Sequence, residues 1–248
     1  MCSYGHDLAF IHDAGYSGYA LGAAPGLLRI LKTHKITHGL VVDLGCGSGR
    51  WARELNDAGY DVLGIDQSRA MIALAREIAP KSRFQASSLF RVELPACDAI
   101  TSVGECMNYC FDKKRSRGTL RRLFRSCYRA LKPGGLLIFD VATLQRKPKS
   151  GSREHESSGT GWKITAKTTV RGSRKLRREI AAHRKTGAGW RRTREVHDLR
   201  LYAENEVADD LRRCGFCVRV VRRFGRFRLP LGIVGFIAVR QGFRGRRR

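Results

Sequence analysis

Two patterns of apolar and polar positions divide the chain, and the first covers residues 40–141. Short, mainly apolar runs typical of strands occur at 40–43, 60–65, 84–87, 97–103 and 136–141. The segments between them have helical spacing, and the best example places apolar side chains three and four positions apart, at Leu120, Leu123, Phe124, Cys127 and Leu131. Strands that alternate with helices predict an α/β fold with a doubly wound, mostly parallel sheet.

The second pattern begins after residue 142 and has a period of two. Polar and apolar residues alternate at 162–171, 176–185 and 190–202, with glycine-containing turns between them. This alternation predicts an antiparallel meander of three strands. Residues 144–160 are expected to form a mobile hinge loop. Asn205 is expected to cap a helix that continues through Leu211, and strands at 216–221 and 233–239 would complete a seven-stranded sheet.

These patterns predict an insertion between the fifth strand of the sheet and its last helix. The expected parts are a helical cap over 1–39, a ligand-binding core over 40–143, an antiparallel β lid over 144–204, a C-terminal helix with the last two core strands over 205–240, and a basic tail over 241–248.

Composition adds a strong charge asymmetry. The 248 residues contain 48 Lys and Arg against 22 Asp and Glu, a formal net charge of +26. Residues 1–145 carry a net charge of +6, whereas residues 146–248 carry +20. A basic surface of this size attracts polyanions such as nucleic acid. Arginine-rich solvent faces of strands would produce the same composition, so both interpretations stay open.

Several classes of protein do not fit the sequence. The apolar run at 229–239 is about half as long as the roughly 20 residues that a spanning helix needs. The first seven residues lack the basic and apolar regions of a signal peptide. The eight cysteines are scattered, and Cys214-Gly-Phe-Cys217 has no second pair at zinc spacing. We therefore expect a cytoplasmic protein without membrane partner, disulfide framework or metal.

A glycine-rich turn supplies the first candidate chemistry. The segment Asp43-Leu-Gly-Cys-Gly-Ser-Gly49 lies where the first strand meets the first helix, at the sheet edge where open α/β folds bind ligands. Glycines permit a tight turn and a close approach of ligand to backbone. Asp66 ends the second strand, where an acid accepts hydrogen bonds from ribose hydroxyls. The spacing G-x-G-x-G differs from the dinucleotide fingerprint G-x-G-x-x-G.

Three features together resemble the class I S-adenosylmethionine-dependent methyltransferases. They are the Asp before the first glycine, Asp66 at the end of the second strand, and the Leu131-Lys-Pro-Gly-Gly-Leu136 turn before the fifth strand. Over residues 40–141 the resemblance rests on these motifs. Over residues 205–240 it rests on the pattern of one helix followed by two strands. It implies the Rossmann-like fold of that superfamily, S-adenosyl-L-methionine as cofactor and S-adenosyl-L-homocysteine as product.

The resemblance also implies which residues hold the cofactor. The methionine part would face Asp43, Gly45, Cys46, Gly47 and Gly49. Asp66 would bind the ribose, and Gln67, Ser68 and Met71 would pack beside the adenosine. An acid usually follows the third strand in this superfamily, but here the residues are Ser87, Ser88 and Leu89. Gly104 and Glu105, after the fourth strand, would line the front of the methyl donor.

The predicted lid favours a small acceptor. It resembles the lid sheets of small-molecule methyltransferases, such as amino-sugar and glycine N-methyltransferases, which are often homodimers. No Asn-Pro-Pro-Tyr or Asp-Pro-Pro-Tyr follows the fourth strand, which argues against exocyclic amines of nucleobases. We therefore expect transfer to a nitrogen or oxygen of a small molecule, in a chain that is a possible homodimer.

Candidate residues around the acceptor are less specific. His197, Glu105 and Tyr109 are the candidate catalytic residues. His197 would equally suit a half-buried structural role, and Glu105 would attract a substrate ammonium group or bind the cofactor amine. The candidate substrate-binding residues are Tyr16, Tyr19, Asn108, Arg200 and Tyr202.

An RNA-directed methyltransferase or an RNA-binding protein is the alternative function. The basic residues that would then bind phosphates are Arg171, Arg174, Lys175, Arg177, Arg178, Arg191 and Arg192. The chain has no appended RNA-binding module and no strand rich in exposed aromatic residues. The small-molecule function is therefore favoured.

Overall fold

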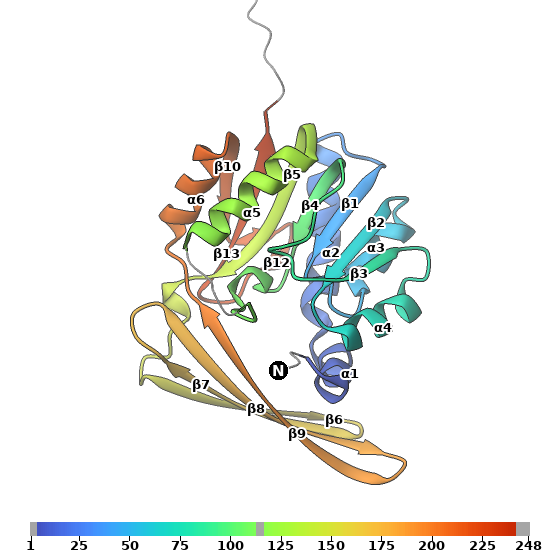
Figure 1. The fold of residues 1–248 in the computed structure, drawn as a ribbon, viewed down its shortest axis with the longest axis vertical. Coiled ribbons are helices and arrows are strands. Elements are labelled where there is room, and N and C mark those ends of the chain that lie inside the picture. Colours follow the sequence, from blue (N-terminus) through green and yellow to red (C-terminus); the bar gives the residue numbers. More distant parts are fainter. Residues whose placement is uncertain (1–3, 113–116, 242–248) are drawn as a thin grey trace, which may run out of the picture.

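A seven-stranded, mostly parallel sheet forms the centre of the computed structural model, which describes residues 4–112 and 117–241 (Figure 1). Its strand order is β10-β13-β5-β4-β1-β2-β3. Only β13 runs antiparallel to its neighbours, β5 and β10. The strands are β1 (Leu40–Leu44), β2 (Asp61–Asp66), β3 (Arg83–Ala86), β4 (Cys97–Ser102), β5 (Leu131–Ala142), β10 (Phe216–Val221) and β13 (Ile233–Arg240). The predicted fold class is confirmed.

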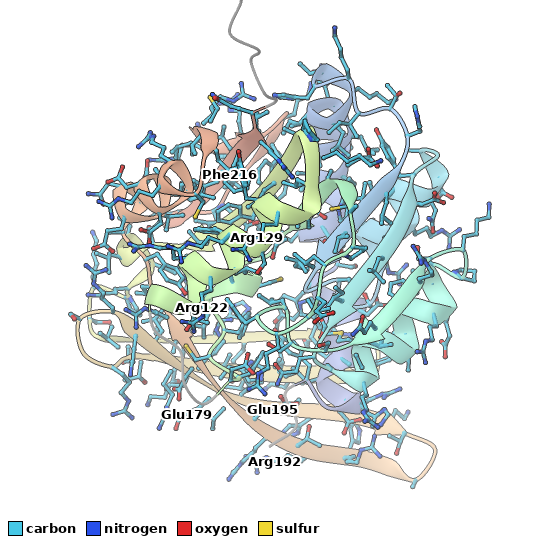
Figure 2. The ribbon with its side chains drawn as sticks, turned by 45° about the horizontal axis from the view of Figure 1, so that its top comes forward. Arg122, Arg129, Glu179, Arg192, Glu195 and Phe216 are labelled. Carbon is cyan, nitrogen blue, oxygen red and sulfur yellow. The ribbon has the colours of Figure 1, made fainter. Side chains whose placement is uncertain are left out.

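Helices cover both faces of this sheet. On one face α2 (Gly18–Thr33) and α3 (Arg50–Asp57) bury Leu27 and Leu55 against the strands. On the other face α5 (Arg117–Ala130) and α6 (Glu204–Arg213) bury Phe124 and Leu211. The helical spacing at 120–131 thus marks a buried stripe, while Arg122 and Arg129 lie on the exposed side of α5 (Figure 2). In α4 (Arg69–Ile78), Ser68 caps the first turn by accepting a hydrogen bond from the backbone N–H of Met71.

A second sheet of four antiparallel strands lies across the carboxyl ends of the central strands (Figure 1). We call it the lid sheet. Its strands are β6 (Ser152–Gly159), β7 (Trp162–Val170), β8 (Lys175–Thr186) and β9 (Gly189–Arg200), in sequence order. The last three were predicted. The hinge loop predicted over 144–160 is wrong over 152–159, because β6 pairs along its whole length with β7. As a polar edge strand, β6 has no apolar alternation that the sequence could reveal.

The first helix, α1 (His6–Tyr16), lies between the two sheets (Figure 1). Its residues Leu8 and Ile11 pack against Trp162 and Ile180 of the lid sheet. On another side Ala9 packs against α4. The helix therefore joins the lid to the central sheet.

Smaller differences from the sequence predictions concern the ends of elements. The predicted cap at Asn205 is wrong, because α6 begins at Glu204 after Ala203 and the Asn205 carboxamide binds the neighbouring N–H of Glu206 instead. A short hairpin of β11 (Arg223–Phe224) and β12 (Phe227–Arg228) was not predicted. Two 3-10 turns, η1 (Cys106–Asn108) and η2 (Leu144–Arg146), follow β4 and β5. Residues 242–248, within the predicted basic tail, lie outside the described residues.

No helix within the described ranges is both long and apolar enough to span a bilayer. In the same part of the chain, no group of three or more His, Cys, Asp or Glu side chains is placed to hold a metal ion.

Candidate active site

A cavity of about 610 Å³ lies between the carboxyl ends of the central strands, α1 and the inner face of the lid sheet. Of the residues singled out from the sequence, it is lined by Tyr16, Tyr19, Asp43, Gly45, Cys46, Gly47, Asp66, Gln67, Met71, Ser87, Ser88, Leu89, Gly104, Glu105 and Tyr109. The fold thus brings most of the candidate residues to one space. Those outside the cavity lining are Gly49, Ser68, Asn108, His197, Arg200 and Tyr202.

The glycine turn leaves open space on its cavity side. Backbone N–H groups of Gly45 and Cys46 donate to the carbonyl of Ile65 at 2.7 and 3.0 Å, which fixes the turn to β2. Gly47 has φ +53° and Gly104 has φ +95°, and a Cβ built at either position meets no atom within 4 Å. Both glycines line the cavity. They therefore keep a surface on which a ligand can rest directly against backbone.

Asp66 is oriented by the backbone around it. One carboxylate oxygen accepts from the N–H of Gly47 at 3.0 Å, and the other accepts from the N–H of Ser68 at 2.8 Å. Burial raises the pKa of this carboxyl. Each oxygen keeps a further lone pair, so the side chain can accept hydroxyl donors from the cavity.

Asp43 is the most deeply buried acid of the turn. Its carboxyl accepts from the hydroxyl of Thr101 at 2.8 Å, and that hydroxyl in turn accepts from the indole N–H of Trp51 at 3.1 Å. Burial raises the pKa of Asp43 to about 7. A cation placed in the cavity beside this carboxyl would favour its charged form.

Asp140 is a structural acid that the sequence analysis missed. It lies near the end of β5 and accepts hydrogen bonds from the N–H groups of Gly104 and Glu105 and from the hydroxyl of Tyr19, the last at 3.0 Å. Burial raises the pKa of this carboxyl to about 6. It fixes the turn after β4 and holds Tyr19 at the cavity. The sequence did contain a sign of this buried role, because Asp140 is the acid inside the otherwise apolar run Leu136-Leu-Ile-Phe-Asp-Val141.

Four side chains form a connected polar group above this turn. The Tyr4 and Tyr109 hydroxyls lie 3.0 Å apart, and the Arg178 guanidinium donates to Tyr109 at 3.1 Å and to Glu105 Oε1 at 3.2 Å. The other oxygen, Glu105 Oε2, is buried without a hydrogen-bond partner. Tyr4 was not identified from the sequence because its partners lie far along the chain. The group places an unsatisfied acceptor in the cavity wall.

His197 lies behind this group and not in the cavity lining. Its Nε2 is 2.8 Å from Glu195 Oε2, and its ring centroid is 4.9 Å from that of Tyr4. Glu195, labelled in Figure 2, also accepts from the N–H groups of Tyr4 and Gly5, both at 2.8 Å. The pair therefore fixes the start of the described chain against the lid sheet.

The other candidates outside the lining make structural contacts. Asn108 donates from Nδ2 to the carbonyls of Ala142 and Arg200 at 2.8 and 2.6 Å, which joins β5 to β9. The Tyr202 hydroxyl donates to the carbonyl of Met107. These contacts hold the lid sheet against the turn after β4.

An acid from a later part of the chain, Asp112, contacts the segment that follows β3. Asp112 lines the cavity, accepts from the Ser88 hydroxyl at 2.6 Å and pairs with Arg91 at 2.7 Å. The local sequence around Ser87 and Ser88 gave no sign of it, because the two segments meet only in the fold.

Comparison with known proteins identifies similar chains. The family model described as a methyltransferase domain matches residues 41–135. The Bacillus subtilis (strain 168) protein named "Putative methyltransferase YqeM" is 25% identical over 190 residues, which cover 72% of this chain and 73% of that protein.

Solved structures resemble the fold over nearly its whole length. An S-adenosylmethionine-dependent methyltransferase from Clostridium acetobutylicum has a TM-score of 0.80 at 17% identity, covering 94% of this chain and 98% of its own. CalS10, an amino pentose methyltransferase from Micromonospora echinaspora solved with S-adenosylmethionine bound, has a TM-score of 0.75 at 21% identity, covering 93% and 97%. The likeness thus includes the lid sheet as well as the central sheet.

Proposed function

The chain belongs to the class I S-adenosylmethionine-dependent methyltransferases, and we propose that it methylates a nitrogen or oxygen of a small molecule enclosed beneath the lid sheet. One observation carries this proposal: a single cavity of about 610 Å³ is lined both by the glycine turn with Asp66 and by the inner face of the lid. A cavity of this size suits a cofactor and a small acceptor side by side.

The lining residues fit the cofactor. The open backbone at Gly47 and Gly104 gives a bulky ligand room to rest there, and Asp66 presents acceptors for the two ribose hydroxyls. Asp43 would face the amino-acid part, whose ammonium group would favour the charged form of this carboxyl. Gln67, Met71, Ser88 and Leu89 line the same cavity and would surround the adenosine part. When bound, S-adenosylmethionine supplies a methyl group on a positively charged sulfur.

The chain itself contributes alignment and exclusion of water. Methyl transfer is a displacement in line with the bond to the leaving sulfur, so geometry dominates its rate. The lid sheet and α1 close the cavity on the acceptor side, and Tyr4 and Tyr109 form part of that wall. Glu105 Oε2, which has no partner, accepts a proton or an ammonium hydrogen from the acceptor. His197 acts through Tyr4 and Glu195 and is a positioning residue.

The ion pairs of the basic residues argue against the RNA-directed alternative. Four of the seven candidate phosphate-binding residues already face acids: Arg174 pairs with Glu206, Arg177 with Asp198, Arg178 with Glu105, and Arg191 with Asp7. At each of them the acid already offsets the positive charge that would attract a phosphate. The homodimer suggested by the lid stays a prediction.

Calorimetry with S-adenosylhomocysteine tests the cofactor site. Asp66→Ala removes the charged acceptor of two hydroxyls and is expected to weaken binding roughly ten- to hundredfold. The matched control is Asp61→Ala, at the exposed start of the same strand, which should bind as wild type does. Equal affinities of Asp66→Ala and wild type would remove the basis of the proposal.

Transfer of a labelled methyl group tests the acceptor class. Labelled S-adenosylmethionine is offered with a small-metabolite extract and, separately, with total RNA. We expect label in a small product that depends on Asp66. Saturable transfer into RNA would establish the alternative function instead.

A further inference from the structure

We propose that the acceptor carries an anionic group, a carboxylate or a phosphate, which binds four basic side chains at the lid end of the cavity. These lid-end basic residues are Arg146, Lys147, Arg153 and His155. The inference rests on the proposed function and names the chemical class of its acceptor.

The four residues come from one continuous stretch of chain. η2 and the segment after it supply Arg146 and Lys147, and β6 supplies Arg153 and His155. All four line the same cavity as the glycine turn, together with Pro230 and Leu231. The Arg146 guanidinium donates to the carbonyl of Leu231 at 3.3 Å, which places these two segments together at the cavity wall. The lid end is therefore a defined region and not a scatter of surface charge.

The two faces of β6 differ in how their charges are paired. On the face away from the cavity, Glu154 pairs with Lys167 at 3.2 Å and Glu156 with Lys163 at 3.4 Å. Arg153 and His155 alternate with these acids and lie opposite Thr168 and Ala166, which line the cavity. Among the described residues, no acid forms an ion pair with Arg146, Lys147 or Arg153. The outer charges are balanced within the sheet, whereas the inner ones are not.

Arg178, which lines the cavity from the lid sheet, is already paired. Arg178 faces Glu105 and Tyr109, so it belongs to the polar group beside the glycine turn. The acids that line the cavity, Asp43, Asp66, Glu105 and Asp112, come from the central sheet and the segments after its strands. The cavity therefore has an acidic side that suits the cationic cofactor and a basic lid end that suits an anion. Unpaired like charges around one space repel each other, and an anion between them relieves that repulsion.

The guanidinium groups fit either anion. Arg presents paired N–H donors that match the two oxygens of a carboxylate or phosphate, and Lys adds a point charge. An anionic group held at the lid end would direct the rest of the acceptor toward the glycine turn. Binding there would thus orient the acceptor atom for transfer.

Calorimetry on the complete protein, saturated with S-adenosylhomocysteine, tests the inference without turnover. The probes are inorganic pyrophosphate and glutarate, titrated separately at fixed ionic strength. Two double variants remove the same formal charge: Lys147→Ala with Arg153→Ala at the cavity, and Lys163→Ala with Lys167→Ala on the outer face. We expect one saturable site in wild type, a loss of about tenfold or more in the first variant, and a change within about twofold in the second.

The outcomes separate the possibilities. A preference for pyrophosphate assigns a phosphate to the acceptor, and a preference for glutarate assigns a carboxylate. Equal losses in both double variants, or no saturable binding in wild type, would overturn the inference, because only the general positive field would then be acting. The affinity for S-adenosylhomocysteine, measured first, separates the two proposals: its absence contradicts the proposed function, whereas its presence without a pyrophosphate or glutarate site contradicts this inference alone.

Discussion

His12 on α1 illustrates how burial sets the charge of a single side chain. Its ring lies edge-on to Tyr4, with centroids 5.4 Å apart, and it stacks on Tyr16 at 6.0 Å. Its Nδ1 is buried without a hydrogen-bond partner. Burial, with a smaller contribution from the nearby His197, lowers the pKa of His12 to about 4, so the ring is neutral near pH 7.

The lowered pKa of His12 predicts a pH-dependent stability. Between about pH 4 and 6.5 the unfolded chain binds a proton at this residue and the folded chain does not, so its contribution falls as the pH is lowered through that window. The contribution lost by pH 4 is of the order of 3 kcal/mol. His12→Phe should lack this part of the acid destabilisation in urea unfolding measured at several pH values. His38→Phe, at an exposed position, should follow wild type, and a wild-type slope in His12→Phe would contradict the prediction.

The sequence identified side chains whose role depends on local spacing. Asp43, Gly47 and Asp66 were recognisable because each lies at a fixed place relative to a strand end. Asp112, Asp140 and Tyr4 were missed, because their roles depend on contacts between segments far apart in the chain. The imidazole of His197 suits a general base. Its position behind the cavity wall follows from the register of β9 and the position of Tyr4, which the sequence does not show.

At the scale of elements, α1 is the link between lid and central sheet. On the lid side its Asp7 pairs with Arg191, and Arg184 lies 3.6 Å from the same carboxylate. On the core side Asp13 accepts from the Ser48 hydroxyl at 2.6 Å and from Arg50 at 2.7 and 2.8 Å. Ser48 belongs to the glycine turn, so α1 fixes the turn from outside.

Removal of the Asp13 carboxylate should affect both stability and cofactor binding. Asp13→Ala leaves Ser48 and Arg50 without their acceptor, so we expect a loss of about 1–3 kcal/mol in the free energy of unfolding. Binding of S-adenosylhomocysteine should weaken several-fold because the turn loses an anchor. Urea unfolding and calorimetry measure the two effects.

The matched control also removes an Asp that faces an Arg of α3. Asp57 lies 3.8 Å from Arg53 on the exposed side of the helix, where such pairs contribute about 0.3–0.5 kcal/mol. Asp57→Ala should therefore bind cofactor as wild type does. If the Asp13 and Asp57 variants behave alike, α1 does not hold the turn.

Elements were predictable where side chains carry a periodic signal. The lid strands β7, β8 and β9 and the helix α5 follow clear periods of two and 3.6. β6 lacks such a signal, since every residue from Ser152 to Gly159 is polar or glycine and its stability comes from backbone pairing with β7. The hairpin of β11 and β12 is too short for any period to appear.

For the whole molecule, the arrangement of the strands came from the family resemblance and not from the pattern. Alternating strands and helices indicate a parallel sheet, but they do not fix a last strand that runs antiparallel between β5 and β10. The net charge of +26 was equally ambiguous in sequence. In the structure the basic residues form three groups: arginines in ion pairs, the lid-end basic residues, and exposed residues such as Arg192 on the outer face of β9 (Figure 2).

This distribution of charge predicts weak and unproductive RNA binding. In filter-binding measurements, the affinity for RNA should fall steeply between 50 and 200 mM salt. Exposed arginines attract phosphates through an electrostatic interaction that salt screens. RNA at 150 mM salt should leave methyl transfer to the small acceptor unchanged. Arg171→Gln with Arg192→Gln should weaken RNA binding without altering that transfer. Competition between RNA and the small acceptor at 150 mM salt would refute this prediction.

The opposite positions of Tyr4 and Arg240 have a practical consequence for labelling. Tyr4 forms part of the cavity wall. Arg240 ends β13 beside the start of β5, where its guanidinium donates to the carbonyls of Arg129 and Leu131. The end of β13 lies on the side of the central sheet away from the lid sheet (Figure 1). A fluorophore or immobilisation handle attached to the end of β13 is therefore expected to lie away from the reaction space. The same handle attached at Tyr4 would lie in the cavity wall and would compete with the ligands for room.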